Sequence, residues 1–348
     1  MAVSIDIEKN LKGFQLRVRI KSNAPTMGIL GASGSGKSMT LRCIAGIETP
    51  DAGHIEVNGR TLFDSDRKIN QKPQERRVGY LFQNYALFPA MTVEQNLACG
   101  CRGSRREALE KAAEFVARYQ LAGLEKLYPA QLSGGQQQRA ALARMMMSEP
   151  DMILLDEPFS AQDGYLKDIV QRDMQNFLRS YEGDMMLVTH NRDEAFKFCE
   201  QLTLLKNGKT LNSGDTREIF ENPGSVEAAR LTGCKNFSRA ERLDEHHVFA
   251  RDWGLRLCTK ERVGEDISAV AVRGHWLRTA SQPGKNTMPV ERVEYIENTF
   301  EHQFLIKNRD VKDAGNLWWM CQKKSFMETA ELPEYLYFPP EHLMLLRD

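Results

Sequence analysis

The sequence has no excess of charge of either sign. Lys and Arg together number 47, and Asp and Glu also number 47. A protein that holds nucleic acid through its phosphate backbone needs a basic surface that displaces counterions. The balanced charge therefore disfavours nucleic acid as a partner.

Long apolar runs are also missing. No stretch approaches the roughly 18 apolar residues of a membrane span, and the first residues lack the basic and apolar segments of a signal peptide. We expect any contact with a membrane to be made through a partner protein.

Cysteines are few and show no repeated spacing. Seven are scattered through 348 residues, whereas a small secreted disulfide framework is dense in cysteine. Reduced thiols, as in the cytosol, are the expected state. Cys99 and Cys101 form a C-x-C without a partner pair or histidine cluster, so their spacing does not indicate a metal site.

The composition is that of an ordinary globular protein, with 41% hydrophobic and 27% charged residues. The length exceeds that of most single domains and suits two. The chain shows no internal repeat and no low-complexity tract. We therefore expect two folded domains.

The first part of the chain predicts strands around a strand, loop and helix. Residues 3–20 alternate apolar and polar side chains, which is typical of antiparallel strands with one buried face. Residues 27–30 form a short apolar strand, and residues 38–45 a plausible buried helix. A second hairpin is expected around Asn58-Gly59, because this dipeptide supplies positive φ in a tight turn.

The middle of the chain predicts helices followed by buried strands. An apolar stripe at helical spacing is formed by Leu109, Ala112, Phe115 or Val116, and Tyr119, within a helical stretch from residue 84 to about 150. Residues 152–155 and 185–188 are continuous apolar runs of the kind found in strands buried on both faces. Polar residues follow both runs, where parallel sheets place their functional groups.

The pattern changes near residue 235. Short alternating segments follow one another with little helical character, and this spacing predicts a small β-barrel or sandwich.

Residues 31–38 read G-A-S-G-S-G-K-S and fit the phosphate-loop pattern G-x-x-x-x-G-K-[ST]. Glycines let backbone N–H groups surround a phosphate, Lys37 reaches its outer oxygens, and Ser38 suits Mg²⁺. The flanking strand and helix favour this interpretation over a chance glycine turn.

Two carboxylates, Asp156 and Glu157, follow the buried run at residues 152–155. One can hold Mg²⁺ while the other orients or deprotonates water. A solvated acidic turn is the alternative, and the phosphate loop upstream favours the functional interpretation.

Residues 132–136 read L-S-G-G-Q and predict a second anion-binding turn before a helix. Because L-S-G-G-Q-Q-Q-R stands shortly before L-L-D-E-P, the sequence resembles the ATP-binding-cassette ATPases. The resemblance implies an α/β P-loop NTPase domain at residues 1–234, with an N-terminal antiparallel β subdomain and a helical insert at about 84–150. It also implies a small all-β domain of the OB- or MOP-like barrel type at residues 235–348.

The resemblance also implies a set of site residues. Gln83, Glu157 and His190 would be catalytic, and Ser38, Gln83 and Asp156 would hold Mg²⁺. The implied ATP-binding residues are Gly31, Ala32, Ser33, Gly34, Ser35, Gly36, Lys37, Ser38, Met39, Phe14, Ser133, Gly134, Gly135 and Gln136. For Phe14, adenine stacking and a core position stay open. Asp163 matches the loop that links two ATP sites, although Gln162 stands where the family commonly has Leu.

Partners follow from the resemblance as well. The implied assembly is a homodimer that sandwiches two ATP molecules, bound at the cytoplasmic face of the cell membrane to integral-membrane permease subunits. An external solute-binding protein would act on it indirectly. The segment after Gln83, N-Y-A-L-F-P-A-M-T-V, is expected to be an exposed apolar and aromatic patch, where the family receives a permease helix.

The segments F-Q-N-Y-A-L-F-P and T-V-E-Q-N and the C-terminal β domain resemble importer subunits for oxyanions, sugars, iron or polyamines. Within that class, Cys234-Lys235-Asn236 and V-R-G-H-W-L near residues 272–277 resemble the molybdate and sulfate branch. The resemblance implies molybdate first, or a related oxyanion such as tungstate or sulfate, with ferric iron, sugars and polyamines as alternatives. Arg273, His275 and Arg278 would form an oxyanion site in the C-terminal domain or line a solvated strand of a dimerisation spacer. A non-transport cassette ATPase and a non-hydrolysing regulatory subunit are the competing classes. A non-transport cassette ATPase usually has a second cassette, and this sequence shows only one. A non-hydrolysing regulatory subunit is disfavoured because Lys37 and Glu157 are both present.

Overall fold

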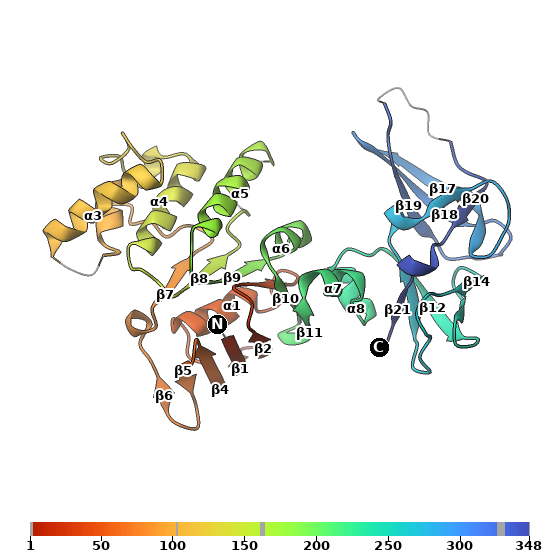
Figure 1. Ribbon diagram of the computed structural model, residues 1–348, viewed down its shortest axis with the longest axis horizontal. Coiled ribbons are helices and arrows are strands. Elements are labelled where there is room, and N and C mark those ends of the chain that lie inside the picture. The colour runs from red at the N-terminus through yellow and green to blue at the C-terminus, as the bar shows by residue number, and fades with distance from the viewer. Residues whose placement is uncertain (1–2, 102–103, 161–163, 326–330, 348) are drawn as a thin grey trace. The chain divides into compact units, whose positions relative to one another are not determined.

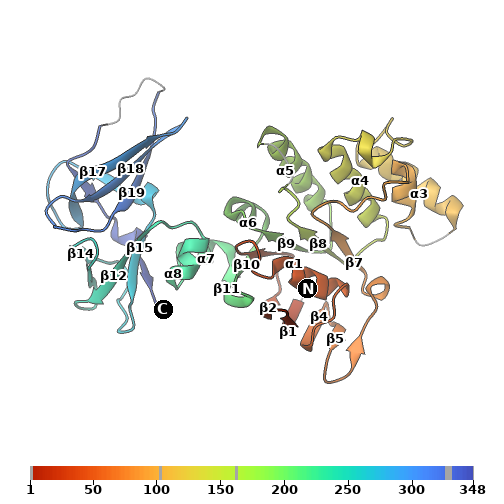
Figure 2. The same ribbon diagram turned by 180° about the vertical axis from the view of Figure 1, so that it is seen from behind.

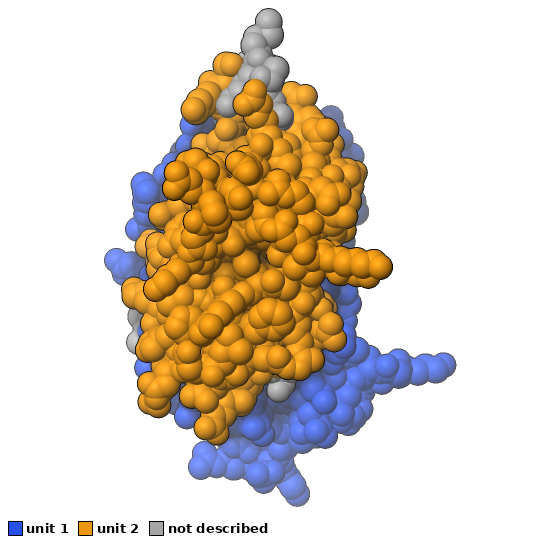
Figure 3. All heavy atoms as spheres, turned by 90° about the vertical axis from the view of Figure 1, so that its right-hand side faces the viewer, with its two compact units in different colours: residues 1–216 blue, residues 217–348 orange. Residues whose placement is uncertain are grey.

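The computed structural model describes residues 3–101, 104–160, 164–325 and 331–347. The chain divides into two compact units, Met1–Thr216 and Arg217–Asp348, which Figure 3 shows in two colours. No helix among the described residues has both the length and the apolar character needed to cross a bilayer.

The first unit is built on one 11-stranded sheet with the order β6-β5-β4-β1-β2-β11-β10-β3-β9-β8-β7 (Figure 1). Its strands are β1 (Val3–Leu11), β2 (Phe14–Ser22), β3 (Thr26–Leu30), β4 (Ala52–Val57), β5 (Arg60–Asp64), β6 (Ile69–Asn70), β7 (Val78–Leu81), β8 (Met152–Asp156), β9 (Asp184–Thr189), β10 (Gln201–Lys206) and β11 (Lys209–Asp215). Strands β10, β3, β9, β8 and β7 run parallel, whereas β1, β2, β4, β5 and β6 form an antiparallel extension.

The antiparallel part confirms both predicted hairpins. Strands β1 and β2 pair with Leu11 opposite Phe14, and their inward residues form a core with β4. Asn58 and Gly59 join β4 to β5 with φ angles of 52° and 74°. These positive angles are those of the hairpin turn that the Asn-Gly dipeptide predicts.

The parallel part confirms the predicted buried strands. Every residue of β8 and β9 is buried, because helices lie on both faces of this half of the sheet (Figures 1 and 2). In a parallel sheet covered on both faces, polar residues are confined to the strand ends. The carboxyl ends of β3, β8 and β9 are therefore the places where functional side chains gather.

Helices of the first unit are α1 (Lys37–Ala45), α2 (Val93–Ala98), α3 (Arg105–Arg118), α4 (Gly134–Met146), α5 (Gly164–Arg179) and α6 (Arg192–Phe198), with the 3₁₀ turns η1 (Pro73–Glu75) and η2 (Pro129–Gln131). The helices α2, α3 and α4 confirm the predicted insert. One detail of that prediction is wrong, because Leu109 is 38% exposed. The buried stripe of α3 is made by Ala108, Ala112 and Val116, which lie four residues apart.

The second unit begins with two short helices, α7 (Thr216–Glu221) and α8 (Val226–Leu231), and continues as two five-stranded sheets. One sheet has the order β14-β13-β12-β15-β21, and the other β16-β20-β17-β18-β19. The strands are β12 (Asn236–Arg242), β13 (His247–Ala250), β14 (Leu255–Cys258), β15 (Ala269–Val272), β16 (Arg278–Ala280), β17 (Thr287–Glu297), β18 (Glu301–Asn308), β19 (Leu317–Gln322), β20 (Tyr335–Tyr337) and β21 (Met344–Leu346), with the 3₁₀ turns η3 (Gly274–Trp276) and η4 (Pro340–His342).

A buried core that includes Trp253, Phe304 and Phe338 holds this unit together. The β-rich character was predicted. The closed barrel is not confirmed, because the pairings among the described residues form two separate sheets.

The compact units divide between residues 216 and 217, whereas the sequence predicts a domain boundary between 234 and 235. The difference arises from α8 and the turn after it. Ala229 and Cys234 are buried in one cluster with Ala271 and Leu346 of the second unit. These residues therefore share a core with strands that lie far along the chain, which a local pattern does not reveal.

Candidate functional site

The glycine loop connects β3 to α1 as predicted. Gly36 caps the start of α1 with a φ of 103°, and a Cβ there would overlap the Leu16 side chain. A Cβ on Gly31 would overlap the Leu205 carbonyl oxygen. Glycine is required at both positions because the loop passes so close to neighbouring strands.

Lys37 lies beneath this loop and holds its shape. Its side chain is only 4% exposed, and its Nζ donates hydrogen bonds to Gly31 O at 2.9 Å and Ala32 O at 3.0 Å. The same Nζ lies 3.6 Å from Glu157 Oε1. Burial lowers the pKa of Lys37, and the Glu157 charge opposes that shift. The ammonium group is thus already directed toward the strand end where Glu157 lies.

Asp156 ends β8 and is buried at 5% exposure. Its Oδ1 accepts a hydrogen bond from Ser38 Oγ at 2.7 Å, and its Oδ2 accepts one from Tyr80 Oη at 2.8 Å. A hydroxyl and a carboxylate are the oxygen ligands that Mg²⁺ prefers. Ser38 and Asp156 therefore fit the predicted metal role by their chemistry and their proximity.

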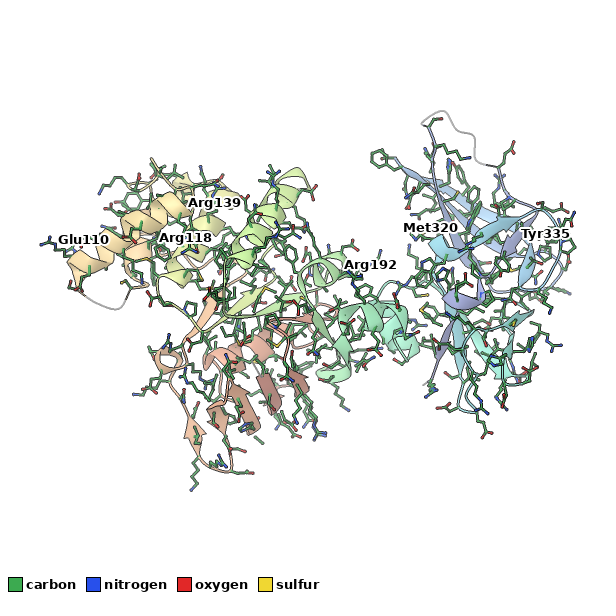
Figure 4. The ribbon with its side chains drawn as sticks, in the orientation of Figure 1. Glu110, Arg118, Arg139, Arg192, Met320 and Tyr335 are labelled. Carbon is green, nitrogen blue, oxygen red and sulfur yellow. The ribbon has the colours of Figure 1, made fainter. Side chains whose placement is uncertain are left out.

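Glu157 follows at a turn with a φ of 46°. Its backbone N–H donates to Val188 O at 2.9 Å, and its Oε2 lies 2.9 Å from His190 Nδ1. Because β8 and β9 are adjacent and parallel, Glu157 and His190 follow neighbouring strand ends. The chain then turns into α6, whose first residue, Arg192, is labelled in Figure 4.

Gln83 lies just beyond the end of β7. Its Nε2 donates to Ser160 Oγ at 3.2 Å, and Ser160 Oγ donates to the Glu157 carbonyl oxygen at 2.9 Å. The amide is exposed. The structure thus brings the predicted glutamine into the neighbourhood of Glu157 through one intervening serine.

The remaining loop residues differ in exposure. Ala32, Ser33 and Gly34 are exposed, while Ser35 is buried with no hydrogen-bond partner for its hydroxyl. Phe14 and Met39 are partly buried against the core of the first unit. The Phe14 ring also borders Gly36, so both positions that the sequence leaves open for Phe14, beside a ligand and against the core, agree with its surroundings.

The L-S-G-G-Q turn lies at the start of α4. Ser133 caps this helix, with its Oγ accepting from Gln136 N at 3.4 Å and its own N–H donating to Gln136 Oε1 at 2.8 Å. Ser133 and Gly134 are exposed. Within the described part of the chain, no hydrogen bond or ion pair joins this turn to the phosphate loop. Gln162 and Asp163 lie outside the described residues.

Figure 4 labels Arg139 on α4 and Arg118 on α3, which belong to the helical insert. Arg139 Nη1 lies 3.6 Å from Asp173 Oδ2 on α5. The insert therefore has ionic contacts of its own to the helix that follows β8.

Sequence reasoning missed two residues near the site. Tyr80 bonds to Asp156 from within β7, where an alternating pattern marks it only as a strand residue. Arg76 is 2% exposed and donates to Cys43 O and Ile44 O at the end of α1, each at 2.8 Å. In the sequence it belongs to an ordinary charged run, E-R-R, so only the tertiary structure identifies it.

The three residues predicted as an oxyanion site in the second unit have other partners. Arg273 donates to Thr232 O at 2.7 Å and to Phe220 O at 2.6 Å. The ion pairs of the other two are exposed, with His275 beside Glu301 at 3.3 Å and Arg278 near Glu341 at 3.7 Å. These contacts favour the structural interpretation of all three.

The chain is similar to known proteins of one family. The ABC transporter family profile matches residues 15–160. The sulfate/thiosulfate import ATP-binding protein CysA of Halalkalibacterium halodurans is 36% identical over 314 residues, covering 87% of this chain and 86% of the relative. The Fe(3+) ions import ATP-binding protein FbpC of Haemophilus influenzae is 38% identical, covering 63% of this chain and 62% of the relative.

A solved structure adds to these relatives. The dimeric post-hydrolysis state of the ATP-binding cassette MJ0796, bound to ADP and Pi, is 28% identical with a TM-score of 0.51. The match covers 62% of this chain and 99% of that chain. The chain thus belongs to the ATP-binding proteins of the ABC transporter family. It is an ATPase, and its similarity to import ATP-binding proteins supports the importer type within that family.

Proposed function

We propose that the chain is the ATP-hydrolysing subunit of an importer, with oxyanions as its solute class. The observation that carries the ATPase part is the convergence of Lys37, Asp156, Glu157 and His190 at one edge of the parallel sheet. Phosphoryl transfer to water needs a phosphate cradle, a metal site and a group that directs the water. These residues supply all three kinds of group.

Each proposed role follows from a contact. Lys37 would bind the outer phosphate oxygens, and Ser38, Gln83 and Asp156 would hold Mg²⁺, which neutralises phosphate charge when bound. Glu157 would orient water and accept its proton. Its carboxylate is held between Lys37 and His190, so its orientation is fixed before any substrate arrives.

A homodimer is the proposed working unit. Ser133 and Gly134 are exposed, and a Cβ on Gly134 would meet no atom within 4 Å. Backbone N–H groups at the start of α4 are therefore accessible to a phosphate bound by a second copy. The dimeric state in which the MJ0796 cassette was solved supports the same arrangement.

The proposed contact with the permease lies after Gln83. Phe88 is 49% exposed, and its ring lies 5.2 Å from the Arg144 guanidinium. Tyr85, by contrast, is only 6% exposed, which corrects the expectation that the whole segment is exposed. A partner helix would contact Phe88 and its neighbours, and would hold the protein at the cytoplasmic face of the membrane.

The solute class is supported by the names of the relatives. Sulfate and thiosulfate are oxyanions, whereas the second group of relatives is named for ferric iron. Molybdate and tungstate belong to the proposed class without being singled out within it. Uptake of labelled sulfate, molybdate and ferric iron is measured in cells that carry the wild-type chain and in cells that carry the Glu157→Gln variant. The solute whose uptake the variant reduces most is the one that the transporter carries. Loss of iron uptake alone would replace the oxyanion proposal by the ferric alternative.

A regulatory oxyanion site in the second unit is a separate proposal, and Arg273 contributes little to it because two of its donors are already used. Equilibrium dialysis of the chain with molybdate and sulfate tests it. Absence of binding at millimolar concentration would leave this unit without a ligand role.

The hydrolysis mechanism is tested by Glu157→Gln. The amide keeps the size of the side chain but cannot accept the proton, so we expect steady-state ATPase activity to fall by about a hundredfold or more. ATP binding should persist, and dimers should accumulate with ATP in size-exclusion chromatography. Full ATPase activity in this variant would remove Glu157 from the proposed role.

A further inference from the structure

Tyr80 extends the proposed metal site beyond its predicted residues. Tyr80 Oη donates to Asp156 Oδ2 at 2.8 Å, on the oxygen that Ser38 does not contact. These contacts make a continuous chain from Tyr80 through Asp156 to Ser38.

The fold places the members of this chain on facing surfaces. Ser38 lies in the first turn of α1. Tyr80 lies opposite Leu154 in the β7–β8 pairing, and Asp156 follows Leu154 by two residues on the same face of the sheet. Tyr80 packs against the core that α1 covers. Tyr80 and Asp156 therefore lie on the face of the sheet that α1 covers.

The two hydrogen bonds to Asp156 differ in what they can do. Ser38 is itself a proposed metal ligand, so its hydroxyl serves two partners. Tyr80 has no other proposed role, and a phenol that donates to a carboxylate forms a charge-assisted hydrogen bond. The Tyr80 hydroxyl has the Asp156 carboxylate as its acceptor.

We propose that Tyr80 is a positioning residue that fixes the Asp156 carboxylate in the orientation needed for the metal. The inference rests on the proposed Mg²⁺-dependent ATPase function. Tyr80 touches no reacting atom. Removal of its hydroxyl should therefore weaken the Mg²⁺-dependent part of nucleotide binding and leave binding without Mg²⁺ unchanged.

The test uses the full chain with Tyr80→Phe, which removes one hydroxyl and keeps the ring. Binding of a fluorescent ATP analogue is measured in EDTA and across a Mg²⁺ titration. We expect unchanged affinity in EDTA, and in Mg²⁺ an affinity lower by about ten- to a hundredfold, the net worth of one hydrogen bond to a charged group. The Mg²⁺ concentration for half-maximal binding should rise correspondingly.

Two further variants complete the design. Tyr181→Phe also removes a partly buried hydroxyl, which donates to Pro150 O at 3.0 Å away from the proposed site, and it should leave the Mg²⁺ titration unchanged. Tyr80→Met also removes the Tyr80 hydroxyl and should shift the titration in the same direction as Tyr80→Phe, and it decides the question if circular dichroism shows Tyr80→Phe to be unfolded.

The outcomes distinguish failure of the positioning role from failure of the proposed Mg²⁺-dependent ATPase function. A Mg²⁺ titration of Tyr80→Phe that overlaps the wild-type curve overturns the positioning role, and so does an equal loss of affinity in EDTA, because that indicates general damage. If the wild-type chain gains no affinity from Mg²⁺, the proposed metal function fails instead. An additional check replaces Mg²⁺ by Mn²⁺, whose electron paramagnetic resonance signal should change between wild type and Tyr80→Phe in the presence of nucleotide.

Discussion

Replacing Arg76 with Met should destabilise the first unit by several kcal/mol. The guanidinium donates to Cys43 O and Ile44 O, both at 2.8 Å, and to Gln71 O at 2.9 Å. A buried acceptor that loses its partner costs about 1–3 kcal/mol. The cation also lies at the carboxyl end of α1, where it interacts favourably with the helix dipole.

The net figure is smaller than the sum of these terms. Met retains much of the side-chain volume, and the variant no longer has to bury a charge, a cost that lowers the pKa of Arg76 in the native chain. Cys43 O also keeps a hydrogen bond from Gly46 N at 3.2 Å. We therefore expect a loss of about 2–5 kcal/mol in the free energy of unfolding, which lowers the melting temperature by about 5–15 °C for a unit of this size.

Differential scanning calorimetry of the full chain measures this effect. The transition of the second unit serves as an internal reference, and Arg77→Met serves as the matched control. Arg77 is 50% exposed and pairs with Asp151 at 3.0 Å, so its loss should cost less than about 1 kcal/mol. Equal melting temperatures for Arg76→Met and the wild-type chain would refute the capping role, as would equal shifts in both variants.

Two further predictions concern the loop and the second unit. Gly36→Ala should abolish binding of ATP analogues, because its Cβ would overlap Leu16. In Gly34→Ala the new Cβ meets no atom, so the variant should lose only about 1 kcal/mol of binding free energy, from its left-handed backbone. Equal binding of ATP analogues by the two variants would contradict this prediction. Asp252→Asn should destabilise the second unit at neutral pH, since the Arg239 hydrogen bond lowers the pKa of Asp252. That stabilisation is present above the ordinary Asp pKa of about 3.9 and is lost as the pH falls through the lower folded pKa. The denaturation midpoints of variant and wild type should therefore draw together as the pH falls below about 3.9.

The sequence predicts the site well where local patterns determine structure. The phosphate loop between β3 and α1 follows from glycines and a flanking apolar run. The apolar runs before Asp156 and His190 likewise predict buried strands. In a sheet covered on both faces, polar side chains are confined to the ends of such strands.

Contacts between distant segments are not predictable in this way. The chain brings Tyr80 to Asp156 across 76 positions and Arg76 to Cys43 across 33, and neither residue has a composition or spacing that marks it. Leu109 was assigned to the wrong side of α3 for a related reason. Alanines at positions 108 and 112 are weak hydrophobic signals, yet they form the buried stripe because α2 packs closely against α3.

The backbone at Glu157 has a φ of 46°, a conformation that costs a residue with a Cβ about 1 kcal/mol or more and that Gly or Asn adopts more readily. Substitution by either residue would relax the turn and remove the carboxylate. A screen that selects only for heat resistance would therefore tend to collect inactive proteins at this position. The chain has Glu at this position nonetheless, so the turn gives up some stability in favour of the carboxylate that the proposed turnover requires.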